Sequence, residues 1–308
     1  MPIRIPDDLP ARKTLEREGV AVMDSTRAAR QDIRPLQIGL LNLMPNKERT
    51  ETQFARLIGA TPLQVDLTLV RISDHKSKNT AEAYLKTFYE TWEEVRAQKF
   101  DGFIVTGAPI ANIPFEEVRY WPEMLEIMDW TQTNVHHTMF ICWGAQAALH
   151  HFHGARRYRM PKKAFGVFRH HIVSPHSKWL RGFSDSPMIP VSRFNDIDRA
   201  SLGGDLEILI DNADIGVCFL DDPGHRSVHM LNHLEYDNRS LADEYERDVK
   251  AGLDPAPPVN LFPNGEPVAE PENRWRSHAH LLFQNWISEI YQTTPFDWVG
   301  DGVESTLT

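Results

Sequence analysis

The stretch that decides the fold is HTMFICWGAQAAL, residues 137–149. Its first part is apolar and favours a strand, and small, helix-favouring residues follow Cys142. We therefore predict a strand, a tight turn and a helix, with Cys142 at the apex of the turn. A thiolate there would meet substrate, and the N-terminus of the helix would offer N–H groups to an oxyanion. The pattern fits equally well a buried cysteine that acts as a small hydrophobic residue.

Length and charge restrict the class of protein. The chain has 308 residues, of which 41% are hydrophobic and 25% charged, and this is ordinary for a globular protein with a large core. A net charge of -10 argues against a general surface for nucleic acid or anionic membranes. We expect neither nucleic acid nor membrane as a partner.

The small number of cysteines predicts that the protein is located in the cytoplasm. Only Cys142 and Cys218 occur, so no disulfide framework and no C-x-x-C metal motif is present. Residues 1–8 lack the apolar core of a signal peptide, and no apolar run is long enough to span a bilayer. Cys218 lies in an apolar strand over 215–220, and we expect it to be a core residue.

The fourteen histidines do not predict a metal site. Pairs such as His150/His151 and His170/His171 lack carboxylates or cysteines at the spacing usual for zinc. We expect no metal and no bound cofactor.

The first half of the chain alternates strands with helices. Apolar runs predict strands over 37–43, 63–72 and 102–106, and helical patterns lie between and after them, including 81–98 and 116–133. This order predicts an α/β fold with a mostly parallel sheet covered on both faces. Ligands of such sheets bind beyond the carboxyl ends of the strands, where the turn 107–109 and Cys142 would lie.

Beyond Arg156 the pattern changes, because short strands follow one another with turns between them. This favours a mixed or antiparallel extension of the sheet. We predict an N-terminal arm over 1–35 with a short helix near 11–19, a single domain over 36–297, and a disordered tail over 298–308. The expected strands are 166–173, 187–191, 206–211, 215–220 and 227–231, and helices are expected over 240–251 and 274–292.

A cysteine nucleophile needs a base, and the base needs an orienting group. Residues 232–237 are NHLEYD, and residues two apart in an extended segment face the same side. His233 and Glu235 could therefore point together towards Cys142 at the edge of the sheet, which makes these three residues a candidate triad. The alternative is that His233 is one surface histidine among many.

Five motifs together resemble the bacterial homoserine O-acyltransferases of the MetA type, over about residues 1–297. They are MPNK at 44–47, TGAP at 106–109, ICWGAQAA at 141–148, HLEYD at 233–237 and NRWRSH at 273–278. The combination is specific, although each motif alone is weak. The resemblance implies a three-layer fold like that of class I glutamine amidotransferases, flavodoxin-like in its sheet, with an N-terminal arm and a C-terminal helical extension. It also implies a homodimer that transfers an acyl group from acyl-CoA, as co-substrate, to the hydroxyl of L-homoserine in methionine biosynthesis.

Carried over residue by residue, the resemblance makes Cys142 the acyl acceptor, His233 the general base and Glu235 its orienter. These are the residues chosen above on chemical grounds. The backbone N–H of Trp143 is the natural oxyanion donor, with a second donor expected near Gly107 or within 41–44.

The resemblance also assigns substrate positions to Lys163, Ser192 and Arg247. An arginine suits the α-carboxylate of homoserine, because its planar fork can donate two hydrogen bonds. Without the resemblance, Arg247 would be an exposed helix charge and Ser192 a polar residue at a strand end.

Donor specificity depends on Ala111 in this comparison. In the family, a glutamate at this position is associated with the use of acetyl-CoA as donor and a glycine with the use of succinyl-CoA. Alanine matches neither pattern. A glutamate would fill the acyl pocket and repel a succinyl carboxylate, whereas alanine leaves room and adds no charge. We therefore predict succinyl-CoA, with acetyl-CoA as the alternative.

Two other functions use the same fold. One is a glutamine amidotransferase or related cysteine hydrolase, with water as acceptor. The other is a flavodoxin-like binding module in which Cys142 is only structural. The triad chemistry and the motif series both favour the acyltransferase.

Overall fold

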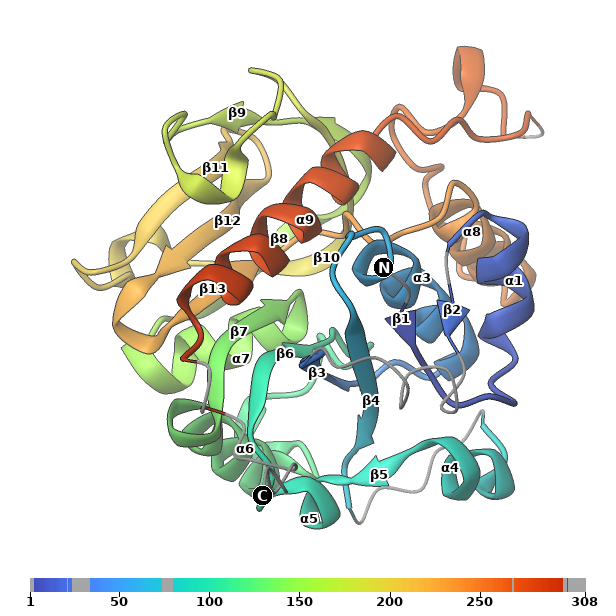
Figure 1. Ribbon diagram of the computed structural model, residues 1–308. Coiled ribbons are helices and arrows are strands. Elements are labelled where there is room, and N and C mark those ends of the chain that lie inside the picture. Colours follow the sequence, from blue (N-terminus) through green and yellow to red (C-terminus); the bar gives the residue numbers. More distant parts are fainter. Residues whose placement is uncertain are drawn as a thin grey trace, which may run out of the picture. The chain divides into compact units, whose positions relative to one another are not determined.

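The computed structural model describes residues 3–20, 22–23, 34–73, 80–267, 269–295 and 298 of the chain (Figure 1). They belong to two compact units. The first unit comprises Met1–Val105, Arg119–Thr138 and Trp286–Thr308, and the second comprises Thr106–Val118 and Met139–Asn285. Residues 1–2, 21 and 24–33 of the predicted arm, and all of the predicted tail except residue 298, lie outside the described residues.

In the first unit, parallel strands pair in the order β2-β1-β4-β3-β6, and β5 pairs with β4 (Figure 1). The predicted arm therefore contributes two short strands, β1 and β2, to this sheet. The strands are β1 (Ile3–Arg4), β2 (Val22–Met23), β3 (Leu36–Leu41), β4 (Val65–Arg71), β5 (Glu90–Thr91) and β6 (Phe100–Val105).

The helices of the first unit follow the predicted alternation, with one correction. The single helix predicted over 81–98 is wrong, because the chain becomes extended at Tyr89, which is buried. A capping box between Thr91 and Glu94 then starts a new helix. The helices are α1 (Ala11–Arg17), α3 (Lys47–Ile58), α4 (Glu82–Phe88), α5 (Trp92–Val95) and α6 (Trp121–Asn134).

Strand β7 (Val135–Ile141) leads from the first unit into the second and ends one residue before Cys142, and α7 (Trp143–His153) follows directly. The strand, turn and helix predicted from residues 137–149 are therefore confirmed. Helix α7 ends where Gly154 adopts a left-handed conformation at φ 64°, as is common at helix C-termini.

The antiparallel extension is also confirmed, since the second unit pairs β13, β12, β11 and β9 antiparallel in that order. Strands β8 and β10 do not join them but form a separate antiparallel ribbon. Cys218 is fully buried in β12, as predicted, and burial raises the pKa of its thiol to about 12. The elements are β8 (Arg157–Arg169), β9 (His171–Ile172), β10 (Met188–Ile197), β11 (Glu207–Asn212), β12 (Gly216–Asp222), β13 (Ser227–Met230), α8 (Ser240–Lys250) and α9 (Arg276–Thr293).

Within the part of the chain that the structure describes, none of the helices has the length and apolar character needed to cross a membrane.

Close packing between β3 and β6 requires a glycine in the first unit. A Cβ at Gly39 would lie 2.3 Å from the ring of Phe103. That ring cannot swing away, because it is fully buried and packs edge-on against Phe100 and Trp130.

We predict that Gly39→Ala lowers the free energy of unfolding by roughly 1–3 kcal/mol, because the added methyl overpacks the core. Urea unfolding measures the change. Gly204→Ala is the control, since a Cβ at this exposed glycine meets nothing within 4 Å, and its effect should stay within about 0.5 kcal/mol. Equal stability of the two variants would contradict this account of the β3 and β6 packing.

Candidate active site

Cys142 has a backbone conformation that few residues adopt, with φ 51° and ψ -113°. Its N–H donates to the carbonyl of Met230 (2.7 Å) at the end of β13, and its carbonyl accepts from the N–H of Gln146 (3.0 Å) in α7. Such strained backbone persists only where its surroundings determine it. The arrangement is that of a nucleophile elbow, with the thiol at the sharp strand-to-helix turn.

Gly107 lies directly beside this turn. A Cβ built on it would be 3.0 Å from Cβ of Cys142, 3.6 Å from its Sγ and 3.8 Å from Cε1 of His233. The space at this position is therefore bounded by the side chains of Cys142 and His233 together. A side chain here would occupy the approach to both groups.

The predicted triad is brought together, although not by the strand geometry expected. The Nδ1 atom of His233 lies 2.7 Å from Oε1 of Glu235, but both residues lie in a turn after β13 and not in an extended segment. The imidazole stacks on the ring of Tyr236 at a centroid distance of 4.1 Å, and the His233 N–H donates to the carbonyl of Pro190 (3.0 Å). These contacts fix the ring with its Nε2 edge directed away from Glu235.

The surroundings of His233 favour its protonated form. Burial alone would lower the pKa of the imidazole, but the charge of Cys142, the charge of Glu235 and hydrogen bonds to both residues raise it to about 10. A protonated histidine beside a thiolate is the arrangement by which cysteine enzymes activate their nucleophile. Glu235, which is itself buried, holds the ring in position.

The predicted substrate residues converge on a carboxylate that the sequence did not single out. Oε1 of Glu244, on α8, accepts from Nζ of Lys163 (2.6 Å) and from Oγ of Ser192 (2.9 Å). Arg247, one helical turn further along, lies 3.8 Å from the same oxygen but is 68% exposed and pairs with Asp248. The spacing of Glu244 and Arg247 on one helix face was the signal that could have identified Glu244.

Strand β10 has contacts with both this polar cluster and His233. Ser192 lies two residues after Pro190, whose carbonyl holds the backbone of His233. Alternate residues of a strand lie on the same face, about 7 Å apart. Strand β10 therefore contributes both to the cluster formed by Lys163, Ser192 and Glu244 and to the backbone contact of His233.

The loop that carries Ala111 is hydrogen-bonded to the ribbon formed by β8 and β10. The side chain of Asn195 on β10 donates to the carbonyl of Ala111, and Arg157 and Arg159 on β8 donate to Ile113 and Asn112 of the loop. Two guanidinium groups thus lie against a loop that begins at Gly107, beside the thiol. Ala111 is half-buried.

Trp143 supplies the first backbone N–H of α7 directly after Cys142, and its side chain is buried. Its ring lies against Phe115 at a centroid distance of 5.8 Å. The proposed second donor at Gly107 adjoins Cys142, whereas residues 41–44 belong to the first unit. Both oxyanion assignments stay predictions.

Comparison with known proteins gives the family. A family model described as homoserine O-succinyltransferase matches residues 2–296. This chain belongs to that family. Membership makes it an enzyme that transfers an acyl group to homoserine, and it confirms the resemblance drawn from the five motifs.

Relatives in this family carry two different acyl names. A homoserine O-succinyltransferase of Pelagibacterium halotolerans is 74% identical, over 96% of this chain and 97% of its own length. A homoserine O-acetyltransferase of Rhizorhabdus wittichii is 62% identical (96% and 93% covered), and one of Rhizobium johnstonii is 60% identical (96% and 97%).

Solved structures confirm the predicted fold class. A glutamine amidotransferase of Thermotoga maritima has a TM-score of 0.55 at 13% identity, covering 85% of this chain and all of that one. A glutamine amidotransferase of Methylobacillus flagellatus has a TM-score of 0.51 at 10% identity, covering 83% and 95%. This chain therefore has a class I glutamine amidotransferase-like α/β fold.

We predict that Cys142→Ala lowers the pKa of His233 from about 10, because the cysteine's charge is the largest influence that raises it. A pH titration of the imidazole resonances by NMR measures this, with Cys218→Ala as the control that leaves the triad intact. An unchanged titration in Cys142→Ala would show that the thiol and the imidazole are not coupled.

Proposed function

We propose that this enzyme transfers a succinyl group from succinyl-CoA to the hydroxyl of L-homoserine through a thioester on Cys142. The observation that carries the proposal is the strained turn at Cys142 beside the paired side chains of His233 and Glu235. A nucleophile, a base and an orienting carboxylate are the parts that acyl transfer through a covalent intermediate requires.

In the first half-reaction the thiolate of Cys142 attacks the carbonyl carbon of succinyl-CoA. A new C–S bond forms, and the tetrahedral intermediate collapses by breaking the bond to the CoA sulfur. His233, protonated at the start because its pKa lies near 10, gives its proton to the departing CoA thiolate. The enzyme is left acylated, with a neutral imidazole beside the thioester.

In the second half-reaction the neutral imidazole takes the proton of the homoserine hydroxyl as its oxygen attacks the thioester carbon. The C–S bond to Cys142 breaks and the ester leaves, which restores the thiolate and the protonated His233. Both tetrahedral intermediates carry an oxyanion, for which the N–H of Trp143 and a second N–H near Gly107 are the proposed donors.

Homoserine recognition is assigned to the cluster around Glu244. Its carboxylate can accept from the α-ammonium group, in competition with the present bonds from Lys163 and Ser192. Arg247 is mostly exposed and can turn from Asp248 to the α-carboxylate, which its planar fork can bind with two hydrogen bonds.

The choice of succinyl over acetyl is supported by the loop around Ala111. Alanine leaves space and adds no negative charge, and Arg157 and Arg159 bring positive charge to the same loop. A succinyl carboxylate gains from that charge, whereas an acetyl group does not. The 74% identical relative named as a succinyltransferase agrees with this choice, while the names of the acetyltransferase relatives keep acetyl-CoA as the second candidate.

We further propose that the enzyme acts in methionine biosynthesis as a cytoplasmic homodimer, with acyl-CoA as co-substrate and no bound organic cofactor.

An assay with L-homoserine and each donor in turn tests the function. We expect a higher kcat/KM with succinyl-CoA than with acetyl-CoA, and no turnover with Cys142→Ala. Glutamine without an acyl donor is the control for the hydrolase alternative. Release of ammonia from glutamine, with no ester formed from either donor, would contradict the proposed function.

For specificity, we predict that Ala111→Glu raises the kcat/KM for acetyl-CoA relative to that for succinyl-CoA by at least tenfold. The reason is that a carboxylate at this position would fill the acyl pocket and repel the succinyl group. Ala111→Gln is the matched control, since it adds similar volume without charge. If Ala111→Glu keeps the donor preference of the unmodified enzyme, then residue 111 does not determine specificity here.

A further inference from the structure

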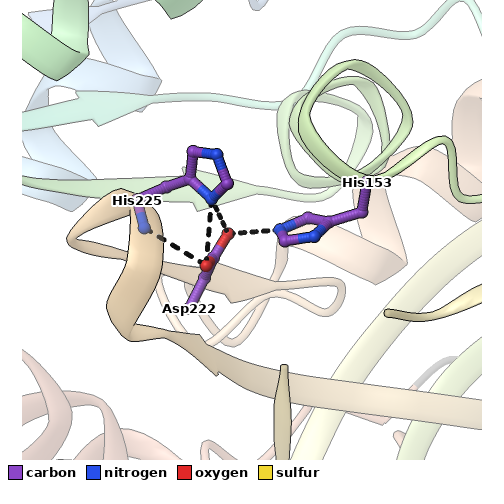
Figure 2. A group of neighbouring side chains, drawn as sticks. All are labelled: His153, Asp222 and His225. Carbon is purple, nitrogen blue, oxygen red and sulfur yellow. Dashed lines mark hydrogen bonds and ion pairs between the residues drawn. The ribbon is translucent and has the colours of Figure 1, made fainter. Parts of the chain in front are cut away.

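Three polar side chains meet at the end of α7 remote from Cys142. His153 is the last residue of α7, whereas Asp222 ends β12 and His225 lies in the turn between β12 and β13, about seventy residues later in the chain. Figure 2 shows the Asp222 carboxylate directed at the two imidazole rings, one carried by the helix and one by the turn.

The nitrogen and oxygen atoms of this cluster converge at one point. Nε2 of His153 lies 2.6 Å from Oδ2 of Asp222, and Nδ1 of His225 lies 3.0 Å from the same oxygen (Figure 2). One such atom from each residue lies within 4.8 Å of the other two. In a tetrahedral zinc site with bonds of about 2.0–2.1 Å, neighbouring ligand atoms lie roughly 3.3 Å apart, so sub-ångström side-chain shifts would open room for the ion.

Burial distinguishes this cluster from exposed histidines. The side chain of Asp222 is fully buried, that of His153 is 11% exposed and that of His225 is 29% exposed. Buried carboxylates are normally paired with cations or bound to metals, and the ion-pair partners that the structure gives Asp222 are all histidines. The partial exposure of His225 provides a path from solvent.

The surrounding residues hold the ligands in place. Phe152 stacks on the ring of His225 at a centroid distance of 4.3 Å. The fully buried His229 places Nε2 3.5 Å from Oδ2 of Asp222 and bonds to Ser227. Supporting contacts of this kind orient ligands in metal sites and are part of their affinity.

We propose that His153, Asp222 and His225 bind a divalent transition-metal ion, with Zn²⁺ as the ion that suits two imidazoles and one carboxylate, and with water at the fourth position. The role is structural. Cys142 precedes the first residue of α7 and His153 is its last, so the helix of 11 residues separates the ion from the thiol by about 16 Å. Binding would clamp the helix that follows the nucleophile to the strand that leads to His233.

The chain pattern did not predict this site, and the reason is topological. His153 neighbours other histidines on a helix end, and Asp222 and His225 come from a strand end and the turn after it, far along the sequence. No short motif connects them, and the proposal therefore departs from the expectation of no metal that the spacing of the histidines gave.

The experiment is calorimetric titration of chelator-stripped protein with Zn²⁺ alone, together with thermal unfolding. We expect one ion per chain and, at about a hundred times the dissociation constant, a rise in Tm of about 5 °C. His225→Ala should weaken binding at least tenfold and, at the same zinc concentration, reduce the rise in Tm by about half or more. His176→Ala, which removes an exposed histidine outside the cluster, should change neither.

Failure to fold does not obscure the result, because His225 is partly exposed and circular dichroism of the metal-free variant reports its fold. Co²⁺ gives an independent readout, since intense visible absorption indicates four-coordinate nitrogen and oxygen ligands and should be lost in His153→Ala. No heat and no shift in Tm with Zn²⁺, or binding that survives both His153→Ala and His225→Ala, would overturn the proposal. The cluster would then be a hydrogen-bonded cap of the turn and no more.

Discussion

The backbone of Cys142 is the constraint on which the site depends. A non-glycine residue at φ 51° persists only if its neighbours hold it there, and here the end of β13 and the first turn of α7 supply those bonds. The same strand end leads into the turn with His233 and Glu235. One local conformation therefore sets both the exposure of the thiol and its distance from the base, while Gly107 keeps the adjoining space open.

Much of this was predictable because the signals are local. The elbow is determined within residues 137–149 by an apolar run, a cysteine and the small residues that follow it. The proposed base and its partner are suggested by two ionisable residues at positions 233 and 235. The reason given for that partnership was nevertheless wrong: a turn, and not strand alternation, brings the imidazole to the carboxylate. The need for a base and an orienting carboxylate predicted the residue types correctly, but it did not predict the backbone conformation that brings them together.

What the sequence missed depends on distant contacts. Glu244 matters because a ribbon of β8 and β10 brings Lys163 and Ser192 to it, and no pattern along the chain records that pairing. The break at Tyr89 follows from hydrogen bonds of its hydroxyl to Glu51 and Asn42 in the core, which override a continuous helical pattern. The grouping of His153 with Asp222 and His225 is non-local in the same way.

The central claim is that Cys142 carries the acyl group. The most direct measurement is the intact mass of the enzyme after mixing with succinyl-CoA in the absence of homoserine, followed by peptide mapping. The account predicts the gain of one succinyl group per chain, located on Cys142, absent from Cys142→Ala and discharged when L-homoserine is added. An enzyme that forms the ester yet never gains this mass, or that carries the group on another residue, would contradict it.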